Sequence, residues 1–313
     1  MKTETKTVLV SGFGSIGQRH VRILRKMGQI VHVFSRRKLQ EEEYYQNLEA
    51  ALRDVHPEYV VIANETSEHH SALKTALSFE IPKILVEKPL FSTSVENLPE
   101  NLKSQVSIAY NLRFHPLLQR FRSEIKEQSV LSVQIYVGQY LPDWRPKQDY
   151  QNSYSVSSAQ GGGVLRDLSH ELDYINWLFG PWQAISALGG HYSSLAGDSD
   201  DVFCLLLKME RCPAVSLQMN YLDRYGRREV LINTDKHTYR LDLMKKEYKR
   251  DQEPATLFSI ERDETYRAQH TDMLKNHGKL CCSLPEGLDV LRMIDAAEKS
   301  AKAESGQKNQ ALR

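Results

Sequence analysis

A glycine-rich turn near the start of the chain has the residue types and spacing of a phosphate-binding loop. Gly12, Gly14 and Gly17 follow the apolar run Thr7–Val10 and precede apolar residues at helical spacing. In a strand–turn–helix unit, Gly12 permits the tight turn, Gly14 lets the backbone approach a pyrophosphate, and Gly17 lets the helix pack close to the strand. The helix N-terminus favours the phosphate charge. The predicted dinucleotide-binding residues of this turn are Gly12, Gly14, Ser15, Ile16 and Gly17. A tight turn without a ligand is the alternative.

The end of the next strand bears on the choice between NAD and NADP. At this place an Asp or Glu would hold the ribose 2′-hydroxyl of NAD. The chain instead has Ser35, Arg36 and Arg37 after the strand Ile30–Phe34. A hydroxyl and two guanidinium groups can hydrogen-bond and neutralise a 2′-phosphate, so the sequence favours NADP over NAD. A solvated basic loop is the alternative.

Polar residues also follow the later apolar strands of the first half. Lys88 comes after Lys83–Val86, and His69 and Asn111 follow two other strands of this kind. Ligands of a doubly wound sheet bind beyond the carboxyl ends of its strands. The pattern therefore makes these three residues candidates for a site, with a surface ion pair for Lys88 and a solvated loop for His69 as alternatives.

A second candidate group lies in the second half of the chain. Asp167 and His170 follow the glycine run Gly161–Gly163, and their positions differ by three. On a helix, residues three apart share a face, which permits the carboxylate to orient the imidazole. The glycines either let a bulky ligand approach or form a flexible entry turn.

The elements that would position these residues divide into two domains. Strands and helices alternate through residues 1–112, which predicts an α/β Rossmann-type doubly wound parallel sheet. From 113 to 313, consecutive strands without helices between them predict an α+β domain with a large, mainly antiparallel sheet. One face of that sheet is expected to be open to solvent, substrate or a partner subunit. Packing of the C-terminal helix against the first domain is left open.

Composition excludes several classes of function. The 313 residues carry a net charge of +1, so no basic field for nucleic-acid binding is expected. No apolar run reaches the ~20 residues of a membrane span, and the N-terminus lacks a signal-peptide core, so the sequence predicts a cytoplasmic protein. The cysteines, at 204, 212, 281 and 282, lack zinc-ligand spacing and are expected to be free thiols, with no metal site.

Three motifs together resemble the glucose-fructose oxidoreductase, inositol dehydrogenase and MocA (Gfo/Idh/MocA) family. They are Gly12–Gly17, Glu87–Pro89 at the end of a later strand, and Gly161–Asp173 at the start of a helix. Nearly the whole chain is covered. Within that family, Tyr110–Pro116 and Gly138–Pro146 resemble a group encoded with bacterial genes for surface-polysaccharide and sialic-acid-type sugars.

The resemblance implies hydride transfer between a nicotinamide and a secondary hydroxyl or ketone of a sugar, phosphosugar or nucleotide sugar. It places Lys88 beside the nicotinamide and the substrate hydroxyl, and makes His170 the general acid/base, supported by Asp167. The chemistry agrees, because alcohol oxidation needs a base near neutral pH and a lysine ammonium stabilises developing alkoxide charge. The usual family spacing between the two residues is four, so this chain is one residue shorter here. Asp173 is the alternative support for His170, or an acceptor for a substrate hydroxyl.

Further residues are expected around the cofactor and the sugar. The resemblance adds Glu87 and His69 on the cofactor side. The predicted substrate-binding residues are Asn111, Arg113, Tyr140, Trp144, Arg145 and Asp173. The aromatic pair could pack against a sugar ring and Arg145 could bind a phosphate. A structural turn held by Pro142 and Pro146 is the alternative.

Two other functions are compatible with the same residues. One is elimination or epimerisation through a transient keto sugar, with a bound cofactor that is recycled. The other is a non-catalytic regulator that senses NADP and a sugar, against which Lys88 and His170 argue. The expected partners are a small sugar-type substrate and further copies of the chain, in a homo-oligomer formed through the open sheet.

Overall fold

The computed structural model describes residues 4–40, 44–93, 98, 102–144 and 149–304. Its contacts divide the chain into two compact units. Unit 1 comprises residues 1–114 and 261–288, and unit 2 comprises residues 115–260 and 289–313. The boundary expected after residue 112 thus falls after residue 114. Residues 261–288, which were expected in the second domain, group with the first.

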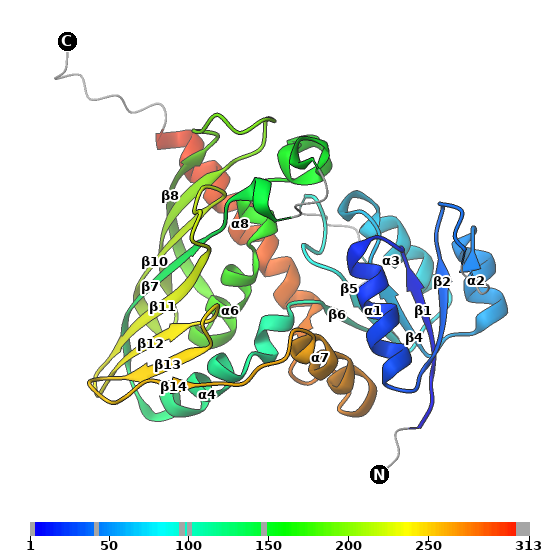
Figure 1. The fold of residues 1–313 in the computed structure, drawn as a ribbon, viewed down its shortest axis with the longest axis horizontal. Helices are drawn as coiled ribbons and strands as arrows, with labels where there is room; N and C mark the ends of the chain where they lie inside the picture. The colour runs from blue at the N-terminus through cyan, green and yellow to red at the C-terminus, as the bar shows by residue number, and fades with distance from the viewer. Residues whose placement is uncertain (1–3, 41–43, 94–97, 99–101, 145–148, 305–313) are drawn as a thin grey trace. The chain divides into compact units, whose positions relative to one another are not determined.

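Unit 1 contains a seven-stranded sheet in the order β15-β6-β5-β4-β1-β2-β3 (Figure 1). Its strands are β1 (Thr7–Ser11), β2 (Ile30–Phe34), β3 (Tyr44–Tyr45), β4 (Tyr59–Ile62), β5 (Lys83–Val86), β6 (Gln105–Ile108) and β15 (Cys282–Ser283). All neighbours pair in parallel except β15, which pairs antiparallel with β6. The doubly wound parallel sheet predicted from the alternating pattern is confirmed. The strand β15 was not predicted, because two residues show no periodicity.

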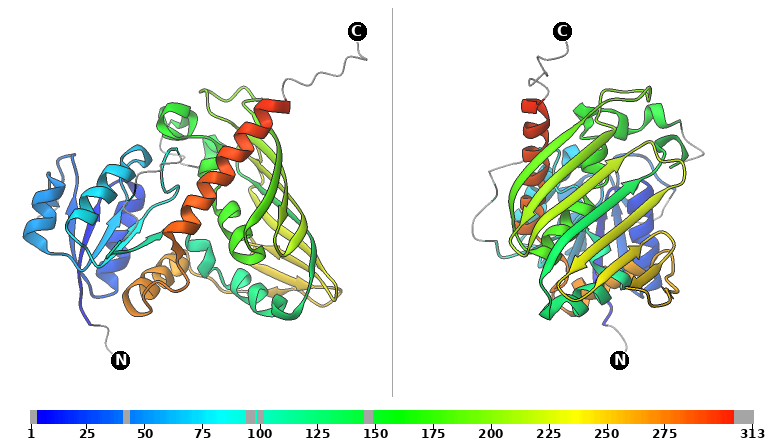
Figure 2. Two further views of the ribbon diagram at one scale, coloured as in Figure 1. Left: turned by 180° about the vertical axis from the view of Figure 1, so that it is seen from behind. Right: turned by 90° about the vertical axis from the view of Figure 1, so that its left-hand side faces the viewer.

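Helices cover both faces of this sheet (Figures 1 and 2). Helices α1 and α7 lie on one face, and α2 and α3 lie on the other. The helical segments of unit 1 are α1 (Ser15–Lys26), η1 (Thr66–Glu68), α2 (Leu48–Val55), α3 (His69–Ser78), η2 (Asn111–Phe114) and α7 (Glu264–Lys275). The Asn47 side chain begins α2 by accepting a hydrogen bond from the Ala50 N–H, at 2.8 Å.

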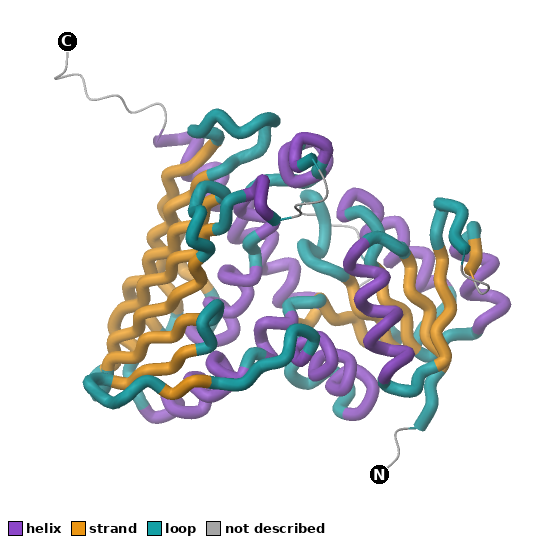
Figure 3. Tube along the Cα trace, in the orientation of Figure 1, coloured by secondary structure: helices purple, strands orange, loops and turns teal. Residues whose placement is uncertain are grey.

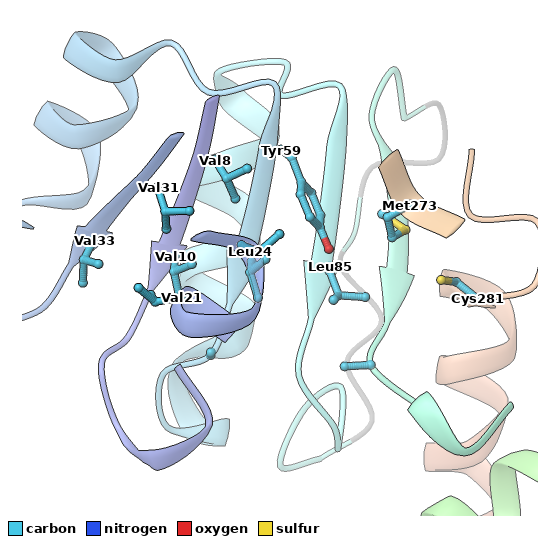
Figure 4. Packing of buried hydrophobic residues seen from close by; sticks show 13 residues of the cluster. Val8, Val10, Val21, Leu24, Val31, Val33, Tyr59, Leu85, Met273 and Cys281 are labelled. Carbon is cyan, nitrogen blue, oxygen red and sulfur yellow. The ribbon is translucent and has the colours of Figure 1, made fainter. Parts of the chain in front are cut away.

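One hydrophobic cluster of unit 1 lies on the side of the sheet that α1 and α7 cover (Figure 4). Val8 and Val10 of β1 and Tyr59 of β4 pack there with Leu24 of α1 and Met273 of α7. The central strands β1, β4 and β5 are buried on both faces, as expected for a parallel sheet covered by helices. Polar side chains of these three strands are therefore confined mainly to the strand ends.

Unit 2 contains an eight-stranded sheet in the order β14-β13-β12-β11-β7-β10-β9-β8. Its strands are β7 (Val130–Gly138), β8 (Trp182–Gly190), β9 (Val202–Met209), β10 (Cys212–Asn220), β11 (Arg227–Thr234), β12 (Thr238–Asp242), β13 (Glu247–Arg250) and β14 (Thr256–Leu257). Only β10 and β7 pair in parallel among the described residues. The predicted large, mainly antiparallel sheet is confirmed (Figure 3).

The helical segments of unit 2 pack on one face of its sheet or lie at its ends. They are α4 (Pro116–Glu124), η3 (Ile125–Glu127), η4 (Leu141–Asp143), η5 (Tyr150–Asn152), η6 (Tyr154–Val156), η7 (Ser158–Gln160), α5 (Val164–Asp167), α6 (His170–Phe179) and α8 (Leu284–Glu304), of which residues from 289 on group with this unit. In the described part of the chain, the opposite face carries no helix (Figure 2, right).

The uncovered face of the unit 2 sheet is partly apolar. Leu188 of β8 and Leu206 of β9 are 59% and 66% exposed. They line a depression of about 650 Å³ together with Cys204. The structure contains no disulfide bond among the four cysteines, all of which lie in the described residues. Among the described residues, we find no helix with the length and apolar character of a membrane span.

Candidate active site

The glycine turn between β1 and α1 has the geometry that a pyrophosphate requires. Gly12 has a φ of +103°, and a Cβ there would lie 2.5 Å from a backbone nitrogen of the segment after β4. At Gly17, a Cβ would lie 2.1 Å from the Gly12 carbonyl oxygen, so only glycine lets α1 pack this closely. At Gly14, a Cβ would meet nothing within 4 Å, so the backbone is open to a ligand. The α1 helix begins at Ser15 without an acidic residue in its first turn, and the Ile16 side chain packs against the core.

The basic residues after β2 already have carboxylate partners. An Arg36 Nη1 lies 2.5 Å from Glu68 Oε1, and Arg37 lies 3.9 Å from Glu65. The buried Ser35 hydroxyl accepts a hydrogen bond from the Arg37 N–H, at 3.1 Å. Exposed ion pairs of this kind contribute about 0–1 kcal/mol, whereas a charge-assisted hydrogen bond contributes about 1.5–3 kcal/mol. A 2′-phosphate at this place would have to compete with Glu65 and Glu68 for these guanidinium groups.

Glu87 and Lys88 follow β5 with different surroundings. Glu87 is 7% exposed, and its carboxylate contacts His20 Nε2 at 2.8 Å in the core. Its other oxygen accepts the Lys88 backbone N–H at 3.1 Å. Glu87, predicted on the cofactor side, thus has its carboxylate directed to α1, while Lys88 is half-buried at the end of the strand.

His69 begins α3 and is 1% exposed. Its Nδ1 lies 3.0 Å from the Pro89 carbonyl oxygen and its Nε2 lies 3.2 Å from the Asn64 carbonyl oxygen. Burial lowers the pKa of His69, although these carbonyl groups act in the opposite direction. The ring therefore joins the segment after β4 to the segment after β5. Its predicted contact with the cofactor stays a prediction.

Asn111 and Arg113 lie in η2, after β6, and both are buried. The Asn111 amide donates to the Thr265 hydroxyl at 2.7 Å, which connects η2 to α7. Arg113 is 2% exposed and pairs with Glu286 at 2.9 Å. Removing Glu286, whose side chain is 41% exposed, would take this partner from the buried Arg113 guanidinium, so the contact has a structural role. Substrate binding by these two residues stays a prediction.

The glycine run before α5 is in close contact with the protein's own atoms. A Cβ at Gly162 would lie 2.2 Å from the Tyr154 carbonyl oxygen, and one at Gly163 would lie 2.2 Å from an Asp200 carboxylate oxygen. Asp200 also accepts the Leu165 N–H at 3.1 Å. Burial raises the pKa of Asp200 to about 6, although that N–H acts in the opposite direction. The close approach predicted for this run is therefore made by Tyr154 and Asp200.

Two tyrosines hold the Asp167 carboxylate. Tyr154 donates to Oδ1 at 2.8 Å and Tyr221 donates to Oδ2 at 2.7 Å. Asp167 is 5% exposed, so these hydrogen bonds replace water. Burial, and after it the charge of Asp167, raises the pKa of Tyr221 well above its usual value, so this phenol stays protonated as a donor. The result is a fixed carboxylate at the end of α5.

Asp167 and His170 do not lie on one continuous helix. Helix α5 ends at Asp167 and α6 begins at His170, with Leu168 between them at φ −99° and ψ 24°. The shared helix face predicted from a spacing of three is therefore wrong. Hydrogen bonds to the distant Asp200 and Tyr221 fix α5 separately, and residue spacing cannot reveal them.

The first turn of α6 contains a half-buried histidine followed by buried carboxylates. His170 is half-buried, whereas Glu171 is fully buried and pairs with Arg228 of β11 at 2.9 Å. Asp173 is 1% exposed, and its backbone N–H donates to the Ser169 carbonyl oxygen at 3.1 Å. The Glu171–Arg228 pair thus anchors α6 to the sheet, and the alternative roles of Asp173 stay predictions.

One of the two predicted aromatic residues, Trp144, connects to Asp167 through Tyr221. The Trp144 ring lies edge-on to Tyr221, with 5.3 Å between ring centroids. The Tyr140 ring carries the Arg224 guanidinium at 4.2 Å from its centroid. Arg145, the predicted phosphate-binding residue, lies outside the described residues. Arg224, which the sequence analysis did not select, is a described cation beside Tyr140.

Two family models match the chain in order. The model described as "Oxidoreductase family, NAD-binding Rossmann fold" matches residues 6–106. The model described as "GFO/IDH/MocA C-terminal domain" matches residues 126–240.

The chain belongs to the Gfo/Idh/MocA oxidoreductase family.

One curated relative of this Gfo/Idh/MocA protein is an uncharacterized oxidoreductase of Synechocystis sp., sll0816. It is 26% identical over 204 residues, which cover 59% of this chain and 54% of the relative. The chain thus spans about half the length of the curated relative it matches.

Solved structures show the same fold. GenD2 from gentamicin A biosynthesis, in complex with NAD, has a TM-score of 0.78 at 19% identity, covering 97% of this chain and 96% of that one. Levoglucosan dehydrogenase in complex with NADH has a TM-score of 0.81 at 16% identity, covering 96% and 98%. UDP-N-acetylglucosamine 3-dehydrogenase GnnA from Acidithiobacillus ferrooxidans has a TM-score of 0.77 at 15% identity, covering 96% and 99%.

The sequence did not reveal which residues would form hydrogen bonds with Asp167, Leu165 and Glu87. Tyr154, Tyr221 and Asp200 lie 13, 54 and 35 positions from their partners Asp167 and Leu165. His20 lies 67 positions from Glu87. His20 does fall at a buried position of the amphipathic α1, and a polar residue at such a position is the one signal that could have indicated a buried partner.

Gly14→Ala tests whether the turn holds a dinucleotide. Gly14 has φ −73°, which alanine adopts without strain, and the added methyl group meets no protein atom within 4 Å. We expect an unchanged melting temperature and an NADH affinity reduced by about tenfold or more, through loss of charge-assisted contacts to phosphate. Circular dichroism and fluorescence titration measure the two quantities.

Gly17→Ala is the matched variant, because its methyl group would overlap the Gly12 carbonyl oxygen. It should lower the melting temperature as well as the affinity. Equal NADH affinity in wild type and Gly14→Ala would contradict a phosphate site at this turn.

Proposed function

We propose that this chain transfers a hydride between a bound nicotinamide dinucleotide and a secondary hydroxyl or ketone of a sugar, phosphosugar or nucleotide sugar. The open backbone at Gly14, at the start of α1, is the observation that carries the proposal. Membership of the oxidoreductase family supports it.

The residues of the turn fit a dinucleotide. A Cβ would fill the closest approaches at Gly12 and Gly17, and the space at Gly14 is open where a phosphate would lie. The helix N-terminus from Ser15 on would bind the phosphate charge. A bound nicotinamide supplies the acceptor or donor of the hydride.

In the proposed mechanism, His170 transfers the proton and Lys88 stabilises the negative charge. When the alcohol is oxidised, His170 takes the hydroxyl proton, and in the reverse direction it returns that proton. The Lys88 ammonium stabilises negative charge on the substrate oxygen. Asp167, held by Tyr154 and Tyr221, provides a fixed carboxylate at the end of α5, and its proposed role is to support His170.

The substrate class rests on the residues near Asp167 and on similar proteins. Tyr140 and Trp144 offer aromatic faces for a sugar ring, and Arg224 beside Tyr140 offers a cation for a phosphate. Similar structures include levoglucosan dehydrogenase and UDP-N-acetylglucosamine 3-dehydrogenase. A role in surface-polysaccharide biosynthesis stays a prediction.

The decisive experiment has two parts. Fluorescence titration with NADPH and NADH measures binding, and absorbance at the nicotinamide band then follows turnover on a panel of sugars and nucleotide sugars. A substrate-dependent absorbance change is the expected result. Tight binding with product formation but no net absorbance change would instead indicate elimination or epimerisation with a recycled cofactor. Binding without any conversion would indicate a regulator.

His170→Asn is expected to lower kcat by about 10²–10⁴-fold, the usual contribution of a general acid/base, while dinucleotide affinity is retained. His277→Asn is the control, because His277 is exposed and its φ of +53° is tolerated by asparagine. Steady-state kinetics and fluorescence titration measure the two effects. Unchanged turnover in His170→Asn would remove this residue from the acid/base role.

The cofactor preference is proposed to be NADP, because Arg36 and Arg37 can bind a 2′-phosphate. Replacing both arginines by serine should weaken NADPH binding by about tenfold or more, with little change for NADH. Lys38→Ser, which removes a neighbouring exposed cation, is the control. An equal loss for both cofactors would refute the preference.

A homo-oligomer is proposed to form through the open sheet of unit 2, where Leu188 and Leu206 are exposed. Leu206→Arg should yield monomers in light scattering, since it places a charge on that face. Met244→Arg, in the turn after β12 and also exposed at 53%, should behave like the wild type. A monomeric wild type would refute this assembly.

A further inference from the structure

A continuous chain of polar side chains runs through the core of unit 1. His20 of α1 contacts Glu87 at 2.8 Å through Nε2 and His270 Nε2 at 2.8 Å through Nδ1. His270 Nδ1 in turn lies 2.9 Å from the Tyr59 hydroxyl. His20, His270 and Tyr59 are each 0% exposed, and Tyr59 lies among the core residues of Figure 4. The chain thus joins α1, α7, β4 and the end of β5.

The protonation of three members follows from their surroundings. Burial works to raise the pKa of Glu87, but its contacts with His20 and Lys88 outweigh burial and lower that pKa. Burial lowers the pKa of His270 well below its usual value, and His20 lowers it further. Burial raises the pKa of Tyr59 well above its usual value. Glu87 is therefore a carboxylate, His270 is neutral and Tyr59 is a protonated phenol.

These states allow a single fully paired arrangement when His20 is neutral. A carboxylate only accepts, so His20 Nε2 donates to Glu87. His20 Nδ1 then accepts from His270 Nε2, and His270 Nδ1 accepts from the Tyr59 hydroxyl. Each polar hydrogen of Tyr59, His270 and His20 then has an acceptor, and every hydrogen bond is donated in the direction of Glu87.

Protonation of His20 would reverse the other bonds. His20 Nδ1 would donate to His270 Nε2, and His270 Nδ1 would donate to Tyr59, whose hydroxyl hydrogen would then need another acceptor. An unpaired buried donor costs about 1–3 kcal/mol, so the count of paired hydrogens by itself favours the neutral arrangement.

The remaining ionisable groups around the chain are few among the described residues. Tyr266 of α7 faces the His20 ring at 5.8 Å between ring centroids, and Arg19 lies 5.0 Å from the Tyr266 ring centroid. Asp263 pairs with Arg19 at 3.5 Å, and Cys281 acts electrostatically on Tyr59. On its other side, Glu87 accepts the backbone N–H of Lys88 and interacts with its charge.

We propose that Tyr59, His270 and His20 are positioning residues that hold an ionised Glu87 against Lys88, so that its carboxylate fixes the Lys88 backbone and favours the Lys88 ammonium. This rests on the proposed function, in which that ammonium stabilises charge on the substrate. Because the chain ends at Tyr59 inside the core, it fixes a charge and does not carry protons to solvent.

The first test is spectroscopic and needs no substrate. Nitrogen NMR of the full-length protein, with the signals of His20 and His270 assigned, reports which ring nitrogen carries hydrogen. We expect both rings to be neutral with hydrogen on Nε2 at neutral pH. A protonated His20, or hydrogen on Nδ1 of either ring, would overturn the proposal.

The substitution Glu87→Gln should reverse the direction of these hydrogen bonds, because it changes the donors and acceptors at position 87 without changing the size of the side chain. If the Lys88 N–H keeps its oxygen acceptor, the new amide nitrogen donates to His20 Nε2, and the Tyr59 hydroxyl hydrogen moves to another acceptor. Both rings are therefore expected to move their hydrogen to Nδ1. Tyr266→Phe, which removes a nearby hydroxyl that is not part of the chain, should leave both rings unchanged. Unchanged rings in Glu87→Gln would also overturn the proposal.

The kinetic test measures whether the negative charge of Glu87 affects turnover through Lys88. Removing a neighbouring charge displaces a protonation equilibrium by about one to three pH units, so kcat of Glu87→Gln is expected to fall about tenfold or more at alkaline pH. The alkaline limb of its pH–rate profile should move to lower pH, with dinucleotide affinity and KM retained, whereas Tyr266→Phe keeps the wild-type profile. Reversed rings with an unchanged profile would overturn the positioning role. Absence of turnover in the wild type would refute the proposed function. The NMR result would still show whether the hydrogen bonds from Tyr59 through His270 and His20 to Glu87 have the proposed direction.

Discussion

Burial of the central strands on both faces determines where unit 1 can place polar groups. In β1, β4 and β5 nearly every side chain is enclosed by helices, so an unpaired polar group within them would be costly. Gly12, Lys88 and His69 accordingly come after strand ends. The same constraint requires buried polar groups to form hydrogen bonds with one another, as Tyr59, His270, His20 and Glu87 do.

The sheet of unit 2 differs from that of unit 1, because it is packed on one face and uncovered on the other. Its polar groups can therefore lie along the strands as well as beyond them. Around α5, the Asp167 carboxylate is enclosed by two phenols, one of which also packs against Trp144. A neighbouring carboxylate, Glu171, pairs with Arg228 across to the sheet. The two short helices of this region are thus fixed separately, each by a buried carboxylate.

Much of the fold was predictable from periodicity. Strand β9 is an example, because apolar residues occupy each of its alternate, buried positions, Phe203, Leu205, Leu207 and Met209. Helix α7 lies in the part of the chain that the sequence assigned to the second domain, and its place in unit 1 was not predicted. The break between Asp167 and His170 was missed as well. The place of α7 and the break after Asp167 both depend on contacts between segments that are distant in the sequence, and a local sequence pattern cannot indicate such contacts.

The sequence by itself determined the order of strands and helices, the glycine turn and the family, since these depend on local spacing and on residue identity. It also indicated which side chains could act on a sugar and a dinucleotide. Only the tertiary structure decided which carboxylates are buried and what holds them: His20 for Glu87, Tyr154 and Tyr221 for Asp167, and Arg228 for Glu171. The reason is physical, because a buried charge takes its partner from whichever segment folding brings into contact, at any distance along the chain.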